Sequence, residues 1–248
     1  MASDMLCVVT GTSAGIGRAV AEALLARDWR VLGIARREVR LHDHNYTHVR
    51  LDLADVDAVE RYFVDEFSRE FPAHDYRRVG LVNNAGLIGP LGPLPKLDLH
   101  ALRDTFTVNT VVPIWLMGYF QRHCGNTPLR IVNVSTGAAV VARAGQVAYC
   151  ASKAALLTGS RVFGDEAAHA PATEHKDAAL LSYEPGMVDT EMQTQIRGTS
   201  SEDLPGVQRF LDAYGQGRLA DAARPAREIA DFLAKDHLPA FSEAKIGG

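Results

Sequence analysis

The fold is decided by the stretch Leu6-Cys7-Val8-Val9-Thr10-Gly11-Thr12-Ser13-Ala14-Gly15-Ile16-Gly17. Its apolar, β-branched first half predicts a buried strand, and the apolar stripe that follows predicts a helix over residues 15–27. Gly11 allows a tight turn, Gly15 lets the backbone approach a pyrophosphate, and Gly17 lets the helix pack close to the strand. Free N–H groups and the dipole at the helix N-terminus favour phosphate there. The alternative is a glycine-rich turn without a ligand.

Further along the chain, short apolar runs alternate with longer segments of helical periodicity. They predict strands at 5–10, 30–35, 47–51, 79–82, 129–134 and 178–183, and helices at 15–27, 55–71, 99–123, 149–168 and 222–234. This alternation predicts an α/β fold with a doubly wound parallel sheet covered by helices on both faces, in three layers. The length of 248 residues predicts a single domain over 1–248. The polar stretch 170–177 is expected to be a surface loop.

Composition excludes several classes of function. A net charge of −4 provides no basic field for nucleic acid or an anionic membrane. No apolar run has the length of a membrane span, and we expect no secretory signal because Met1-Ala2-Ser3-Asp4 lacks a basic region followed by an apolar one. The three cysteines, none in C-x-x-C spacing, predict a reduced, cytoplasmic location. His42, His44 and His48 lie in one polar loop, where we expect solvation and no metal.

Tyr149 and Lys153 form a pair that suits acid–base chemistry. Their i, i+4 spacing puts both side chains on one face of the helix predicted at 149–168. A phenol has an ordinary pKa of about 10, and a fixed cation nearby lowers it. The pair therefore predicts a general acid that exchanges a proton with a substrate oxygen. A solvated pair on a helix surface is the alternative.

Four motifs together give the chain a resemblance to the short-chain dehydrogenase/reductase family. They are Thr10-Gly11-x-x-x-Gly15-x-Gly17, Asn83-Asn84-Ala85-Gly86, Tyr149-x-x-x-Lys153 and Pro185-Gly186-x-Val188-x-Thr190, in the family's order and spacing. Within the family, Tyr183 to Gln193 and the run Val134-Ser135-Thr136-Gly137-Ala138-Ala139 are most similar to sepiapterin and benzil (diketone) reductases. The resemblance implies a Rossmann-like fold, with a cofactor-binding half over about 1–135 and a catalytic, substrate-binding half over about 136–248.

The cofactor expected from these residues is NADP(H). The second predicted strand ends at Ala35 and is followed by Arg36 and Arg37, where NAD-binding proteins carry an acidic residue for the ribose hydroxyl. Two guanidinium groups would bind a 2′-phosphate that a carboxylate would repel. The alternative is that both arginines only solvate a turn.

The resemblance also implies which residues hold the cofactor. Asp52 would accept a hydrogen bond from the adenine amine, although it could instead cap the helix that begins near Asp55. Thr190 would meet the carboxamide or the pyrophosphate. The full set is Gly11, Thr12, Ser13, Gly15, Ile16, Gly17, Arg36, Arg37, Asp52, Leu53, Asn83, Ala85, Gly86, Tyr149, Lys153, Pro185, Gly186, Val188 and Thr190.

The implied reaction is hydride transfer from NADPH to a carbonyl carbon. Tyr149 would give the proton, and Lys153 would lower its pKa and hold the nicotinamide ribose. A hydroxyl, either Thr136 or Ser135, would bond the carbonyl oxygen, unless both hydroxyls only satisfy backbone groups. Asn109 would fix a water in the proton relay, although a hydrogen bond to backbone would also explain an asparagine within a helix.

The substrate pocket is expected from the segments 87–95, 137–146 and 187–217. Their apolar residues predict a ketone or vicinal diketone, and the irregular composition of 193–217 suggests a segment that closes. Sepiapterin reductases carry a pterin-anchoring aspartate near the C-terminus, and we expect no counterpart in Lys245-Ile246-Gly247-Gly248. Two alternatives stay open: an NADP-dependent alcohol dehydrogenase working in the oxidative direction, and a non-catalytic NADPH-binding regulator.

The family usually associates through the helix predicted at 99–123 and the helix that carries Tyr149. The resemblance therefore implies a homodimer or homotetramer. Trp115, Leu116 and Met117 form an apolar patch on the first of these helices, expected to lie in the core or in a subunit interface.

Overall fold

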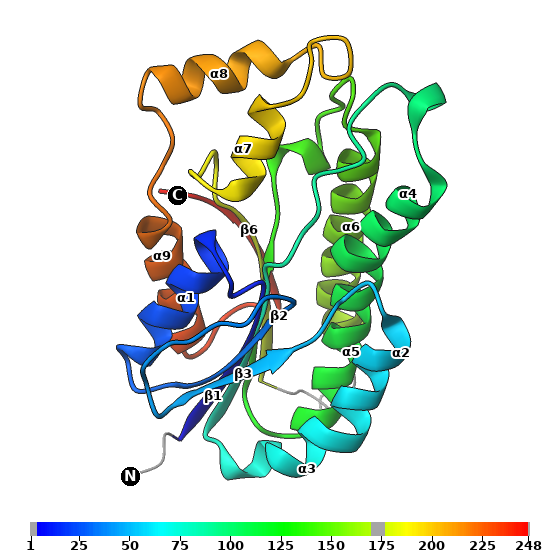
Figure 1. The fold of residues 1–248 in the computed structure, drawn as a ribbon. Coiled ribbons are helices and arrows are strands. Elements are labelled where there is room, and N and C mark those ends of the chain that lie inside the picture. The colour runs from blue at the N-terminus through cyan, green and yellow to red at the C-terminus, as the bar shows by residue number, and fades with distance from the viewer. Residues whose placement is uncertain (1–3, 170–176, 248) are drawn as a thin grey trace.

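In the computed structural model, which describes residues 4–169 and 177–247, seven parallel strands form one sheet in the order β3-β2-β1-β4-β5-β6-β7 (Figure 1). The strands are β1 (Met5–Thr10), β2 (Arg30–Ala35), β3 (Tyr46–Arg50), β4 (Arg78–Asn83), β5 (Leu129–Val134), β6 (Ala178–Glu184) and β7 (Phe241–Lys245). The order reverses between β1 and β4, as in a doubly wound sheet. The predicted α/β, Rossmann-like class is therefore confirmed. Of the expected loop 170–177, all but Asp177 lies outside the described residues.

Helices cover both faces of the sheet (Figure 1). One face packs against α1 (Gly15–Leu25) and α9 (Ala223–Ala234) through an apolar cluster that includes Val20 and Ile229. The other face packs against α5 (Val112–Cys124) and α6 (Val147–His169), around the fully buried rings of Phe63 and Phe120. β4 and β5 are buried along their whole length because both of their faces are covered, which explains their nearly continuous apolar sequence.

Two predicted helices contain a π turn. The helix expected at 55–71 consists of α2 (Val56–Arg61), a π turn (Tyr62–Phe67) and α3 (Ser68–Glu70). The helix expected at 99–123 consists of α4 (Leu99–Phe106), a π turn (Thr107–Val111) and α5. Such turns often mark functional sites, and the second one carries Asn109. Short 3₁₀ turns cover Ala73–Asp75, Leu94–Lys96 and Gly137–Ala139.

Three elements were not predicted. β7 is an edge strand that carries charged residues, so its sequence lacks the apolar run of a buried strand. The segment 193–217, expected to be irregular, is largely helical, with α7 (Glu191–Arg197) and α8 (Val207–Gly215). Both helices are short and have one apolar side, and Figure 1 shows them beyond the end of the sheet.

None of the described helices combines the length and the apolar character needed to cross a bilayer. No three described His, Cys, Asp or Glu side chains gather in a way that could hold a metal ion. Of the apolar patch on α5, Leu116 and Met117 are buried, and Trp115 is partly buried against the same core.

Candidate active site

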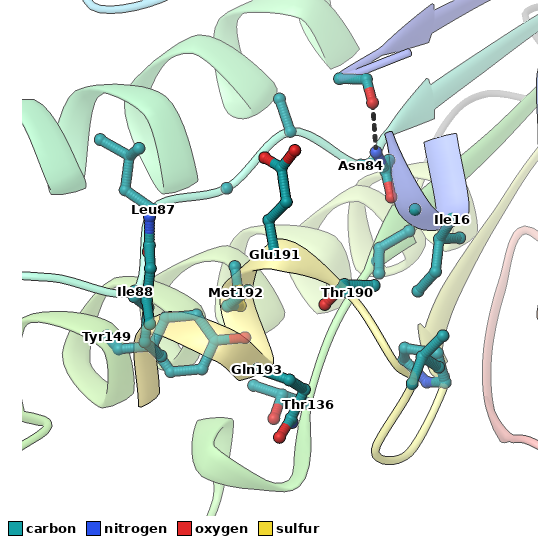
Figure 2. Close-up of a pocket in the computed structure, with 18 of the residues that line it drawn as sticks. Ile16, Asn84, Leu87, Ile88, Thr136, Tyr149, Thr190, Glu191, Met192 and Gln193 are labelled. Atoms are coloured by element: carbon teal, nitrogen blue, oxygen red, sulfur yellow. Dashed lines mark hydrogen bonds between the residues drawn. The ribbon is translucent and has the colours of Figure 1, made fainter. Parts of the chain in front are cut away.

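A cleft of about 930 Å³ lies beyond the carboxyl ends of the strands. The loops after the first six strands all contribute lining residues, and α7 and α8 complete the wall (Figure 2). Most of the residues expected at the site line this one cleft: Gly11, Ser13, Gly15, Ile16, Arg36, Arg37, Asp52, Leu53, Ala85, Gly86, Ser135, Thr136, Tyr149, Lys153, Pro185, Gly186, Val188 and Thr190. The residues expected at the cofactor and the residues expected in catalysis therefore line one continuous cleft.

The glycine loop has the shape that a pyrophosphate needs. Gly11 and Gly15 have positive φ angles of 78° and 56°, which other residues rarely adopt. A Cβ at Gly17 would lie 2.4 Å from the Gly11 carbonyl oxygen, so only glycine permits this packing. Ala14 precedes α1 without a side-chain cap, and no acidic residue occupies the first turn. The N–H groups at this helix end therefore remain available to a phosphate, and the cradle fits a nicotinamide dinucleotide.

Three residues expected at the cofactor do not line the cleft. Gly17 packs under the loop, and the Thr12 hydroxyl lies 3.2 Å from the Tyr46 hydroxyl. Asn83 points into the core and donates to Asn133 Oδ1 over 2.8 Å. The next residue, Asn84, lines the cleft instead and donates through Nδ2 to the carbonyl oxygens of Thr10 (2.9 Å) and Gly11 (3.4 Å; Figure 2).

The two arginines after β2 have different surroundings. Arg36 is exposed, and its guanidinium lies 4.0 Å from Asp52. Arg37 donates to both carboxylate oxygens of Glu191, at 2.9 and 2.8 Å, and to Ser13 Oγ at 3.1 Å. Glu191 begins α7, so this ion pair joins the two walls of the cleft.

The helix after β3 is capped by Asp55 and not by Asp52. Asp55 is the N-cap of α2 and accepts from the Ala58 N–H. Asp52 accepts from the Ala54 N–H through Oδ1, while its Oδ2 faces Arg36. Asp52 therefore supports a turn at the cleft wall and does not cap the helix.

Tyr149 and Lys153 lie on one face of α6, where burial controls the pKa of both. Burial raises the pKa of Tyr149 to about 12, although a hydrogen bond with Thr136 opposes the shift. Burial lowers the pKa of Lys153 to about 8, and its ammonium donates to the Val134 carbonyl oxygen over 2.8 Å. We expected Lys153 to lower the pKa of Tyr149; in the structure, desolvation raises that pKa, the opposing group is Thr136, and the phenol stays protonated at neutral pH.

Thr136 is the hydroxyl that faces the phenol. Figure 2 shows the two side chains at the same end of the cleft, with Ile88 and Met192 nearby. Thr136 Oγ1 accepts from the Ala138 N–H at 3.3 Å, which leaves its own proton available to an oxygen in the cleft. Ser135 also lines the cleft, and its backbone N–H donates to the Tyr183 carbonyl oxygen.

Asn109 is fully buried behind the cleft wall. Its side chain holds Leu87 at both backbone groups: Oδ1 accepts from the Leu87 N–H, and Nδ2 donates to the Leu87 carbonyl, each at 2.8 Å. Nδ2 also donates to Ser152 Oγ at 3.0 Å. The side chain therefore joins the π turn to the loop after β4 and to α6. The backbone hydrogen bonding considered as an alternative is present, and the relay role stays a prediction.

Four lining residues carry polar chemistry to which the sequence analysis assigned no role: Glu191, Gln193, Arg143 and Arg209. Gln193 is 8% exposed, and its Oε1 has no hydrogen-bond partner within the described part of the chain. These residues lie on α7, on α8 and in the turn before α6, within the segments 137–146 and 187–217 from which the pocket was expected.

Comparison with known proteins identifies the family. Residues 6–201 match the model of the short chain dehydrogenase family. A benzil reductase ((S)-benzoin forming) of Bacillus cereus is 30% identical, with 94% of this chain and 95% of that protein covered. A sepiapterin reductase of Xenopus laevis is 29% identical, with 94% and 92% covered. A short chain dehydrogenases/reductase from Saccharomyces cerevisiae has a similar structure, with a TM-score of 0.81, 23% identity, and 99% and 97% covered.

The fold and the site define a nicotinamide-dependent oxidoreductase that acts on a carbonyl or hydroxyl group. The chain belongs to the short chain dehydrogenase family. The family uses NAD(H) or NADP(H), and its substrate is a small molecule.

Proposed function

We propose that this protein is an NADPH-dependent carbonyl reductase that converts a ketone or vicinal diketone to a hydroxyl compound. One observation carries the proposal: Tyr149, protonated at neutral pH, and Thr136 face the same end of a cleft that is continuous with the glycine loop. The phenol carries its proton at neutral pH and can give it to a carbonyl oxygen, as reduction requires. The resemblance in sequence to a benzil reductase supports a diketone.

The residues have distinct tasks in this reaction. The bound cofactor supplies the hydride. Thr136 donates a hydrogen bond to the carbonyl oxygen, where negative charge develops, and Tyr149 transfers its proton to that oxygen. Lys153 provides positive charge beside them, held in place by the Val134 carbonyl. Ile88, Met187 and Met192 pack with Tyr149 and exclude water from the reacting carbonyl.

The choice of NADPH rests on Arg36 and Arg37. Both line the cleft directly after β2, where a 2′-phosphate on the adenosine ribose would lie. Arg36 has its nearest carboxylate 4.0 Å away and is therefore available to a phosphate. Arg37 is paired with Glu191 and would have to exchange partners.

We also propose a homodimer or homotetramer that forms through α5 and α6. Val111 and Ile114, beside and within α5, and Val162, on α6, are apolar and 50%, 39% and 47% exposed, respectively. Burial of such side chains against a second copy would be favourable. Light scattering after size-exclusion chromatography would measure the mass.

The function is tested by following NADPH oxidation at 340 nm with a panel of carbonyl compounds: benzil, isatin, 1-phenyl-1,2-propanedione, sepiapterin and a 3-ketoacyl thioester, each also with NADH. Fast turnover of the diketones, with a higher kcat/KM for NADPH than for NADH, is the expected result. Tight NADPH binding without turnover of any carbonyl compound would favour the non-catalytic regulator. Oxidation of alcohols with NADP and no reduction of ketones would favour the reverse direction.

A further inference from the structure

Most of the charged residues that line the cleft either lie beside an opposite charge or already have a role in the proposed cofactor and acid sites. Arg37 pairs with Glu191 at 2.8 Å, Arg36 lies 4.0 Å from Asp52, and the Glu184 carboxylate is 3.3 Å from Lys245. Lys153, at the reacting end, donates to the Val134 carbonyl. Two cations remain. Within residues 4–169 and 177–247, neither Arg143 nor Arg209 has an acidic side chain within 4.0 Å.

Both arginines line the cleft that contains Tyr149. Arg143 lies in the turn that leads into α6, where its carbonyl accepts from the Gln146 N–H at 3.1 Å. The turn is held in place because the Gly145 carbonyl accepts from the Gly92 N–H at 2.9 Å. Arg143 is therefore carried by a fixed segment six residues before the proposed acid.

Arg209 lines the cleft from α8, and the segment that leads into α8 packs against the turn of Arg143, where Asp203 and Leu204 lie close to Gly145. The neighbour of Arg209 on α8, Phe210, is 8% exposed and belongs to the apolar cluster against which Tyr149, Met187 and Met192 pack. The Arg209 guanidinium carbon lies 5.5 Å from the Phe210 ring centroid. Burial, and then repulsion from the Arg143 guanidinium, lower the pKa of Arg209.

Resting on the proposed function, we infer that the substrate carries a carboxylate as well as the reacting carbonyl, and that Arg143 and Arg209 bind this carboxylate. Two like charges that line one cleft without acidic partners attract an anion, and the guanidinium fork matches a carboxylate. The apolar cluster that contains Phe210, and against which Tyr149 packs, suits an aromatic or aliphatic body. The substrate class is therefore an apolar keto acid.

The reaction balances without a further reagent. The carbonyl carbon takes a hydride, with its electron pair, from the reduced nicotinamide, and the carbonyl oxygen takes the phenolic proton of Tyr149. The product is a hydroxy acid, the nicotinamide is left oxidised, and solvent returns one proton to Tyr149. The carboxylate is unchanged and serves only for binding and orientation.

The test compares phenylglyoxylate with its methyl ester, which has the same aryl ketone but no charge. Arg143→Gln and Arg209→Gln are measured beside Arg227→Gln, which removes an exposed arginine on α9 that does not line the cleft. Each cleft variant should lower the acid-to-ester ratio of kcat/KM about tenfold, mainly through KM. Arg227→Gln should leave that ratio within about twofold, since it changes only distant charge. Benzoate should inhibit reduction of the ester by the native protein and lose potency in both cleft variants.

Unchanged acid-to-ester ratios and unchanged benzoate inhibition in both cleft variants would overturn the inference. If benzil is reduced while phenylglyoxylate is not, the carboxylate site is wrong and the reductase stands. If no neutral or acidic carbonyl compound is reduced, the proposed function fails and the inference fails with it.

Discussion

Glu191 holds the guanidinium of Arg37 through both carboxylate oxygens, at 2.9 and 2.8 Å, across the mouth of the cleft. The hydrogen bond with Arg37 lowers the pKa of Glu191, so the pair is fully charged at neutral pH. A 2′-phosphate would therefore bind the Arg37 guanidinium, which already binds the Glu191 carboxylate. Binding of NADPH would exchange one anionic partner for another.

This competition predicts that Glu191→Gln strengthens the preference for NADPH. The exposed ion pair is weak, so the ratio of kcat/KM for NADPH to that for NADH should rise about two- to fivefold. Glu243→Gln is the matched control, since it breaks a similar exposed pair with Arg161. A fall in the ratio would mean that Glu191 positions Arg37 for the phosphate.

A substitution at Arg36 should weaken the preference for NADPH. Its guanidinium has no closer carboxylate than Asp52, at 4.0 Å. Arg36→Asp should lower kcat/KM for NADPH at least about tenfold and leave the value for NADH nearly unchanged, because the new carboxylate repels the 2′-phosphate. Arg40→Asp places the same charge further along the loop, outside the cleft, and should have little effect. Equal losses with both cofactors would contradict a phosphate site here.

Lys153 should reduce stability in the cofactor-free protein. Burial lowers its pKa to about 8 from 10.5, so below pH 8 the folded state must hold a buried charge. Because the unfolded state binds more protons between pH 8 and 10.5, stability rises with pH across this window. Lys153→Met should raise the free energy of unfolding at pH 7 by about 2 kcal/mol, after subtraction of the lost hydrogen bond to Val134.

Urea unfolding at pH 7 and pH 10.5 measures this effect. The advantage of Lys153→Met should shrink toward the higher pH, whereas Lys235→Met, at an exposed position, should show no such trend. A destabilised Lys153→Met at pH 7 would show that the ammonium is favourably placed even without cofactor.

Asn109 should contribute to stability as well as to turnover. Asn109→Ala leaves the partly buried N–H and carbonyl of Leu87 without their side-chain partner, which should cost about 1–3 kcal/mol of unfolding free energy. Asn126→Ala, in the exposed turn after α5, should cost little. Loss of turnover with an unchanged melting temperature would show that Asn109 acts only in the reaction.

The sequence predicted those parts of the fold that local chemistry determines. The glycine motif predicted a tight turn at Gly11, and Gly11 has the positive φ angle of such a turn. The buried strands required apolar runs, and six strands lie close to the expected ranges. The charged edge strand β7 and the two π turns carry no such local pattern, because their structure depends on tertiary packing.

In the candidate site too, the sequence predicted residues that belong to local motifs and missed contacts between distant segments. Tyr149 and Thr136 were expected together from their motif and its spacing, and the structure brings their side chains together. The pairing of Arg37 with Glu191 joins residues 154 positions apart, and Arg143 and Arg209 line one cleft only because α8 forms part of its wall. No periodicity or motif in one sequence encodes such contacts.

The central claim is that Tyr149 gives the proton to the substrate. It is tested most directly by Tyr149→Phe, with NADPH oxidation followed at 340 nm against a vicinal diketone and NADPH binding measured by fluorescence titration. The account predicts that kcat falls by about 10²–10⁴-fold while the Kd for NADPH changes less than about twofold. Turnover close to that of the native protein would contradict it.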